Sequence, residues 1–261
     1  MSNNAEKPGI GTLTLLSICF RSLFIQASFT LTEKTGVGFA VSLYPGLIKL
    51  TKDKVVIQQL LTRHSRYFNT HPYLAPFILG SVLRLEELAK NNPENAIKNI
   101  ENFKNRFSGV LGSLGDRLFW KYLKPCASSV ALIILFSNMN DFPENSIASI
   151  VGFLVIFNMF HFFYRLTGLY TGYSYGLGVI KVNSILTIER INAVLSMSML
   201  LLLGLLAALE SNLASEGGIT GVVIFSMTGL TVFFLNYKKV SPAVGIIVGL
   251  CISLALFTIL N

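Results

Sequence analysis

Long uncharged stretches dominate the second half of the chain. A helix needs roughly 20 apolar residues to cross a ~30 Å hydrocarbon layer. Four stretches close to that length carry no charged residue: 147–164, 193–209, 217–237 and 240–261. A fifth, 126–140, is shorter and approaches this length if it borrows from 118–123. The pattern predicts several transmembrane helices in this half.

The first half has shorter apolar segments interrupted by polar residues or proline. Residues 11–29 contain Arg21 and Gln26, 36–50 contain Pro45, and 72–83 contain Pro76. Apolar segments of this length are more often re-entrant or interfacial than fully spanning. Irregular backbone survives at membrane depth only where protein or a watery cavity covers it. We therefore expect broken or re-entrant helices in this half.

A short polar segment, "NTHPY" (69–73), is followed directly by an apolar stretch. It is interpreted as the tip of a re-entrant hairpin, with an ordinary cytoplasmic turn as the alternative. The charged stretch 84–106 comes next and contains a helix-breaking proline, Pro93. It predicts two short helices that meet at Pro93 on the cytoplasmic face.

Composition agrees with an integral membrane protein. Hydrophobic residues make up 52% of the 261 and charged residues only 13%, against roughly 25% charged in typical soluble domains. The predicted fold class is an all-α membrane protein with several transmembrane helices. We divide it into an N-terminal region, 1–125, and a transmembrane region, 126–261, which act as one functional unit. The net charge of +8 is dispersed along the chain, which argues against nucleic acid as a partner.

The charges between the apolar stretches predict an orientation. Basic connections alternate with acidic ones, and basic residues concentrate on the cytoplasmic side of membrane proteins. This predicts a multi-pass protein whose basic loops face the cytoplasm. The basic connections contain Lys121, Lys124, Arg165, Lys181, Arg190, Lys238 and Lys239, and the acidic ones contain Asp141, Glu144, Glu210 and Glu216.

Signatures of catalysis or metal binding are absent from the sequence. Cys19, Cys126 and Cys251 lie far apart in apolar stretches, as small buried hydrophobic residues do. The three histidines form no HExxH motif, and neither a CxxC nor a phosphate-binding glycine loop with its lysine is present. We expect no catalytic residue, no metal and no cofactor.

Polar residues at membrane depth are the remaining candidates for function, because they are costly to bury. Asn69 and His71 lie at the predicted hairpin tip, and Asp116 and Trp120 lie in "LGSLGDRLFW". An amide, an imidazole, a carboxylate and an indole face are suited to gripping sugar hydroxyls and the apolar face of a pyranose. These four are the candidate substrate-binding residues, with internal hydrogen bonding as the alternative. Internal hydrogen bonding is favoured for a further pair, Asn158 and His161.

Two motifs give the chain a family resemblance. "FNTHPYLAPFILGSVLRLEE" (68–87) and "LGDRLFWKYLKP" (114–125) resemble hallmark motifs of the IID membrane component of mannose/fructose/sorbose-family sugar phosphotransferase systems. "RSLFIQASF" (21–29), "GFAVSLYPGLIKL" (38–50) and "KKVSPAVGIIVGL" (238–250) are also similar to segments of that family, in the same order.

The resemblance implies a subunit of the bacterial inner (cell) membrane that pairs with a IIC subunit in a hetero-oligomer. Cytoplasmic IIA and IIB phosphocarrier proteins would phosphorylate a hexose or amino-sugar substrate as it enters. The IID chain itself would carry no phosphohistidine and no catalytic residue. This chain departs from the family pattern at "TLTEKTGVG" (30–38) and at Arg117, which follows the aspartate. These departures leave open a divergent, non-transporting scaffold or regulatory subunit of the same fold.

Overall fold

A computed structural model describes residues 9–89, 93–136, 142–181 and some of those between 188 and 206. This part of the chain is almost entirely helical, as predicted, and its only strand-like features are isolated bridges from Lys34 to Thr30 and to Phe68. The predicted spans at 217–237 and 240–261 lie outside the described residues, and the one at 193–209 is described only in part.

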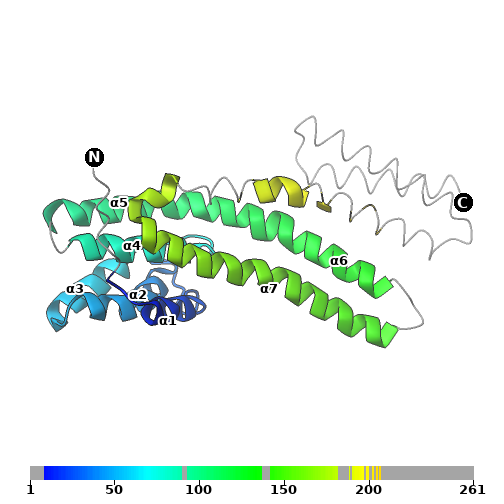
Figure 1. Ribbon diagram of the computed structural model, residues 1–261, viewed down its shortest axis with the longest axis horizontal. Helices are drawn as coiled ribbons and strands as arrows, with labels where there is room; N and C mark the ends of the chain where they lie inside the picture. Colours follow the sequence, from blue (N-terminus) through cyan, green and yellow to red (C-terminus); the bar gives the residue numbers. More distant parts are fainter. Residues whose placement is uncertain are drawn as a thin grey trace, which may run out of the picture. The chain divides into compact units, whose positions relative to one another are not determined.

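The main described elements are helices that follow one another along the chain (Figure 1). They are α1 (Thr12–Ser22), α2 (Gly36–Leu50), α3 (Lys54–His64), α4 (Ala75–Ala89), α5 (Pro93–Gly115), the π-helix η1 (Asp116–Leu123), α6 (Lys124–Phe136), α7 (Phe142–Tyr175) and the 3-10 helix η3 (Gly176–Lys181).

The chain forms two compact units that are not contiguous in sequence. The first contains residues 1–120 and 158–190, and the second contains 121–157 and 191–261. The sequence-based division placed a single boundary after residue 125. In the structure, the latter part of α7 returns to the first unit, so each unit is built from two separate segments.

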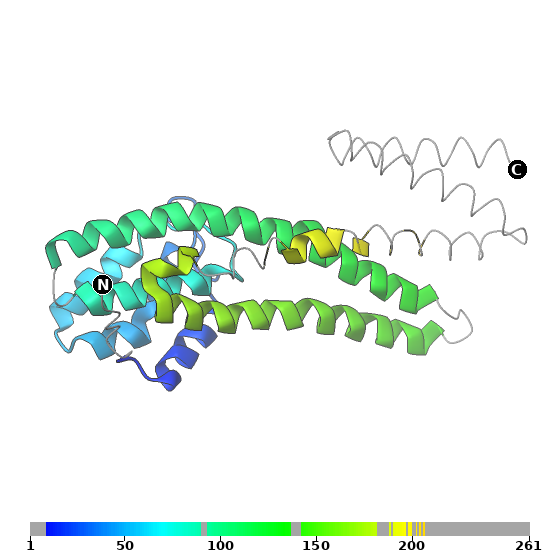
Figure 2. The same ribbon diagram turned by 45° about the horizontal axis from the view of Figure 1, so that its top comes forward.

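Helix α4 forms the centre of the first unit. All ten residues from Ala75 to Arg84 are buried, and α2, α5 and η3 pack around this helix. Gly80 lies so close to the backbone of Leu169 and Tyr173 on α7 that a Cβ atom would strike it. In the same way, Gly172 on α7 approaches the backbone of α4 at Phe77. Figures 1 and 2 show α4 beside this part of α7 in both views.

The short apolar segments of the first half are short helices. At 11 residues α1 is too short to span a membrane, and α2 has 15 residues with Pro45 inside it. Gly38 brings α2 against the backbone of Ile25, just beyond the end of α1. The charged stretch 84–106 does contain a helix that starts at Pro93. However, its helices are longer than predicted, because α4 begins at residue 75 and α5 continues to residue 115.

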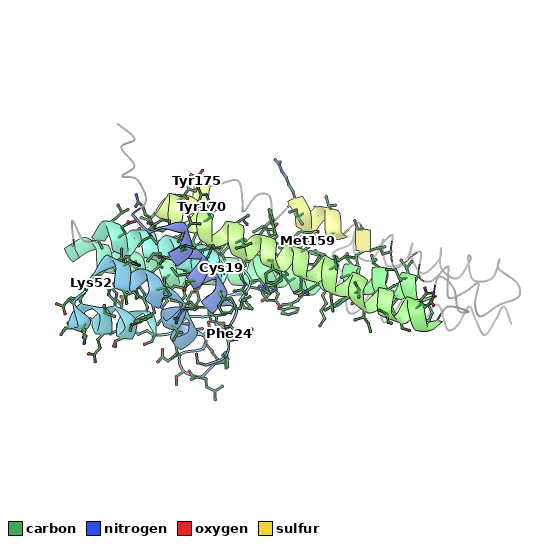
Figure 3. The ribbon with its side chains drawn as sticks, turned by 60° about the horizontal axis from the view of Figure 1, so that its bottom comes forward. Cys19, Phe24, Lys52, Met159, Tyr170 and Tyr175 are labelled. Atoms are coloured by element: carbon green, nitrogen blue, oxygen red, sulfur yellow. The ribbon has the colours of Figure 1, made fainter. Side chains whose placement is uncertain are left out.

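In the second unit, α6 packs against residues 142–157 of α7. The Ser149 hydroxyl donates a hydrogen bond to the Ala131 carbonyl oxygen at 2.7 Å. Two described helical runs, Ile97–Phe136 and Glu144–Val179, are long and apolar enough to cross a membrane. Many apolar side chains of α7 are exposed along its length, including Met159 and Tyr170, which are labelled in Figure 3.

Cys19 and Cys126 are buried free thiols, and Cys251 lies outside the described residues.

Candidate functional site

The polar segment 69–73 forms a tight turn at the start of α4. The carbonyl oxygen of His71 accepts hydrogen bonds from Leu74 N at 3.1 Å and Ala75 N at 3.0 Å, which starts the helix. On the other side of the turn, the carbonyl oxygen of Phe68 accepts from both the backbone N and the hydroxyl of Thr35. The turn is therefore fixed at both ends by backbone groups, and its side chains are left to make other contacts.

A buried arginine on α7 holds the turn in place. Arg165 Nη1 donates to Ser22 Oγ on α1 at 2.6 Å, and Nη2 donates to the carbonyl oxygen of Pro72 at 3.3 Å. Its Nε donates to His161 Nε2 at 3.0 Å, so His161 is an acceptor here. The sequence-based expectation that Arg165 belongs to a basic loop is wrong, because this residue lies within α7 and is 2% exposed.

His71 is enclosed by aromatic rings and a glycine. Its ring stacks on Phe119, with centroids 4.9 Å apart and planes 11° apart, and it lies 5.6 Å from the Trp120 ring. Gly115 leaves room for the imidazole, since a Cβ atom at this position would strike the His71 side chain. Phe119 and Trp120 are presented by η1, and π-helical turns inserted in helices are frequent at functional sites.

Burial lowers the pKa of His71 to about 4, and the positive charge of Arg165 adds to this effect. The imidazole is therefore neutral at pH 7. The Tyr73 backbone N lies 3.4 Å from His71 Nδ1 and donates to it, so the single ring proton belongs on Nε2. Nε2 is buried and has no hydrogen-bond partner among the described residues, and the same holds for Thr70 Oγ1.

These groups line one cavity of about 600 Å³, within the roughly 300–1,000 Å³ typical of small-molecule sites. It lies wholly within the first unit. One wall comes from the turn and the other from the end of α5 and the start of η1. The lining residues are Gln26, Asn69, Thr70, His71, Pro72, Ser108, Gly109, Gly112, Ser113, Asp116, Arg117 and Trp120.

All four candidate residues from the sequence lie on this cavity. Asn69 and Asp116 are exposed, Trp120 is 45% exposed, and His71 is 2% exposed. The structure thus brings together residues more than 40 positions apart in the chain, Asn69 and His71 with Asp116 and Trp120. Gln26, noted only as a polar residue in an apolar segment, lies here as well.

Sequence reasoning missed the small residues that make room for the cavity. Ser108 and Gly112 are four residues apart, as are Gly109 and Ser113, so they share one side of α5, and Asp116 continues the same spacing at the start of η1. This periodicity was the available signal, but close helix packing gives the same pattern. The role of Arg165 was missed because a charged residue at the end of an apolar stretch usually marks the start of a loop.

The comparisons with known proteins agree with this fold. Residues 10–213 match a protein family described as "PTS system mannose/fructose/sorbose family IID component". The match covers most of the chain, which therefore belongs to this family of membrane proteins.

Individual relatives have less than 30% sequence identity to this chain and are longer than it. The chain is 29% identical over 165 residues to the mannose-specific EIID component of Escherichia coli K12, covering 63% of this chain and 56% of that one. It is 26% identical over 167 residues to the fructose permease IID component of Bacillus subtilis, covering 64% and 58%. It thus matches a little over half the length of these relatives.

Solved structures share the fold. A chain in "CryoEM Structure of Mannose Transporter ManYZ and Microcin E492 (MceA) complex" aligns with a TM-score of 0.58 at 22% identity, covering 97% of this chain and 98% of that one. A chain described as "Structure of membrane protein" aligns with a TM-score of 0.64 at 22% identity, covering 96% and 97%.

Proposed function

We propose that this chain is the IID membrane subunit of a mannose-family sugar phosphotransferase permease. In this role it pairs with a IIC subunit in the bacterial inner membrane, crosses the membrane several times and helps to translocate a sugar. The partner IIB protein phosphorylates the sugar with a phosphoryl group supplied through IIA. Family membership supports the role, and relatives named for mannose and fructose support a hexose as the substrate class.

The observation that carries the proposal is the convergence of four polar and aromatic residues on one cavity. Asn69 supplies an amide, and His71 a buried N–H donor that has no partner in the described part of the chain. Asp116 supplies a carboxylate that accepts hydrogen bonds from hydroxyl groups. Trp120 supplies an aromatic face against which the C–H face of a pyranose packs. We assign this cavity to the sugar path.

His71 acts in this proposal as a hydrogen-bond donor and not as a phosphoryl carrier. Its imidazole is buried, its Nδ1 accepts from the Tyr73 backbone N, and its Nε2 carries the proton, so neither ring nitrogen offers a free lone pair to a phosphoryl group. Its neutral state at pH 7 suits recognition of an uncharged hydroxyl group.

The test is accumulation of sugar phosphate in cells, normalised to the amount of membrane-inserted complex. Losing one hydrogen bond to a sugar costs about 0.5–1.5 kcal/mol, rising to about 1.5–3 kcal/mol where the lost partner is charged. Asn69→Ala and Asp116→Asn are therefore expected to lower uptake roughly 3- to 100-fold, with the complex still assembled.

Matched controls make the same chemical changes on exposed residues outside the cavity. Asn99→Ala on α5 and Glu144→Gln at the start of α7 should leave uptake unchanged. If Asn69→Ala and Asp116→Asn assemble and transport at full rate, the sugar path lies elsewhere and the cavity is structural. If wild type itself assembles with its partner but transports none of a panel of hexoses and amino sugars, the scaffold alternative replaces the proposal.

A further inference from the structure

A second polar region lies between α3 and the first part of α5, within the first unit and away from the cavity described above. Two cavities, of about 190 Å³ and 490 Å³, share the residues Arg63, Arg66 and Glu101 in their linings. Lys104 lines the smaller cavity. We call these two cavities together the α3–α5 groove. Its lining thus contains three cationic side chains and one carboxylate among the described residues.

Arg63 is anchored, yet one of its N–H groups has no partner in the described part of the chain. One end of its guanidinium is paired with the carboxylate of Glu86, which also accepts from His64 Nε2 at 2.8 Å. Burial lowers the pKa of His64, so this imidazole contributes no positive charge at pH 7. Arg63 Nε is buried and has no partner among the described residues. The planar guanidinium therefore has an N–H group to offer in a position that Glu86 has already fixed.

Lys104 donates its hydrogen bonds to neutral groups, with the carboxylates of Glu101 and Glu33 acting on it from further away. Its Nζ donates to the carbonyl oxygen of His64 at 2.9 Å and to that of Arg66 at 3.4 Å. The same nitrogen lies 4.8 Å from the Phe39 ring centroid and 5.4 Å from that of Phe68. Carbonyl oxygens and ring faces stabilise an ammonium ion without cancelling its charge. Burial lowers the pKa of Lys104 to about 8, so the side chain is still mostly protonated at pH 7.

Arg66 is paired only loosely. Its Nη1 is 3.7 Å from Glu101 Oε1, and the two side chains are 71% and 41% exposed. Such exposed pairs contribute at most about 1 kcal/mol and re-form readily around a competing ligand. The positive charges of the groove are balanced by carboxylates, because Arg63 is paired with Glu86 and the carboxylates of Glu101 and Glu33 act on Lys104. The donor groups, rather than a net charge, favour an anion, since Arg63 Nε has no partner among the described residues and Arg66 is loosely paired.

The rim of the groove is partly apolar. Val55 is 62% exposed and Ile97 is 44% exposed, and both line the larger cavity. A site with converging guanidinium and ammonium groups beside an apolar edge fits a phosphate group that carries an organic substituent.

We propose that the α3–α5 groove is a binding site for a phosphate group, held by Arg63, Arg66 and Lys104. An anionic phospholipid headgroup and a free phosphate share this chemistry, and the experiment below separates them. The inference does not depend on the transport role, because it concerns other residues and is read by binding alone.

The test is isothermal titration calorimetry on the purified membrane complex that contains the full chain, in a neutral detergent at constant ionic strength. Three probes are titrated: inorganic phosphate, short-chain phosphatidylglycerol, and short-chain phosphatidylcholine, whose headgroup has no net charge. Saturable binding of either anionic probe is expected, with weaker or no binding of phosphatidylcholine. Binding of phosphatidylglycerol alone identifies a lipid site, and binding of inorganic phosphate identifies a site for free phosphate.

Two variants with opposite expected effects locate the site. Arg66→Gln should weaken binding roughly 3- to 10-fold, and Glu101→Gln should tighten it, because it removes the competing carboxylate. The exposed Arg106→Gln makes the same charge change as Arg66→Gln on a residue that lines neither cavity, and should have no effect. The proposal is overturned if neither anionic probe binds saturably, or if Arg106→Gln weakens binding as much as Arg66→Gln.

Discussion

Helix α4 and the first part of α7 are both apolar, yet they occupy opposite environments. In α4, every side chain from Ala75 to Arg84 is buried within the first unit. In α7, apolar residues of the second unit such as Ile147, Ile150 and Val155 are 60–68% exposed. The apolar side chains of α4 are therefore already satisfied by protein, whereas those of α7 remain available to lipid or to a partner subunit.

The difference shows that the hydrophobicity of a segment indicates only that it avoids water. It does not indicate whether protein or lipid covers the segment. A 15-residue apolar helix such as α4 cannot cross a bilayer by itself, but it can be the core around which other helices pack. The two environments predict different responses to mutation. The following predictions test that difference, from the largest expected effect to the smallest.

The largest effect is expected from filling the close contact between α4 and α7. Gly80→Val adds a branched side chain where the backbone of Leu169 and Tyr173 leaves no room for one. Overpacking typically costs about 1–3 kcal/mol and costs more where the obstruction is backbone, as it is here, so little folded complex should remain. The measurement is the folded fraction after detergent extraction, by size-exclusion chromatography.

The control is a smaller substitution, Gly152→Ala, in the exposed part of α7. Its added Cβ atom would lie 3.2 Å from Ile134 Cδ1, the tip of a side chain that can shift. This variant should be recovered at close to the wild-type amount. Equal recovery of Gly80→Val and wild type would show that α4 is not tightly packed against α7.

The next effect concerns the carboxylate near the end of α4. Glu86→Ala leaves the guanidinium of Arg63 and the ring of His64 without their shared acceptor. Breaking a buried ion pair by removing one partner costs about 3–5 kcal/mol, and thermal unfolding of the complex should shift accordingly. Glu101→Ala removes the exposed partner of Arg66 and should cost at most about 1 kcal/mol. Similar losses in the two variants would contradict the burial of Glu86.

A direct comparison of leucines should give a slightly smaller effect. Leu79 on α4 is fully buried, and Leu79→Ala should cost about 2–4 kcal/mol through lost burial and the cavity left behind. Leu154 on α7 is 49% exposed, and Leu154→Ala should cost less than about 1 kcal/mol. Thermal unfolding in detergent measures both. A larger loss for Leu154→Ala would place that side chain in an interface with a partner subunit.

The smallest effect is a pH dependence at the turn that precedes α4. The pKa of His71 is lowered to about 4 in the folded state, against an ordinary value of 6.5, so the unfolded chain takes up the proton first. Stability from this residue is complete above pH 6.5 and is lost as the pH falls toward 4. At pH 5.5 the loss is about 1.4 kcal/mol.

The measurement is the difference in melting temperature of the complex between pH 7.5 and pH 5.5. His71→Gln removes the titrating group and should reduce this difference, whatever its effect on stability at neutral pH. An unchanged pH difference in the variant would show that the His71 ring is protonated as readily in the folded complex as in the unfolded chain.

Much of the candidate site could be predicted from residue chemistry. Asn69, His71, Asp116 and Trp120 were recognisable because polar and indole groups in an apolar chain require partners, and all four line one cavity. The small residues around Gly112 were ambiguous, because helix packing and cavity formation produce the same spacing. The role of Arg165 could not be predicted, because its partners Ser22 and Pro72 are 143 and 93 positions away in the chain.

By itself, the sequence determined the helical class, the membrane character and the family, because these follow from the hydropathy, the helix punctuation at Pro93 and the motifs at 68–87 and 114–125. The tertiary structure decided which apolar helix became a core and which kept an exposed face. It also decided that a charge near the end of an apolar stretch, Arg165, is buried beside the turn at Pro72. The physical reason is that hydropathy is a property of each segment, whereas burial and hydrogen bonding depend on contacts between segments far apart in the chain.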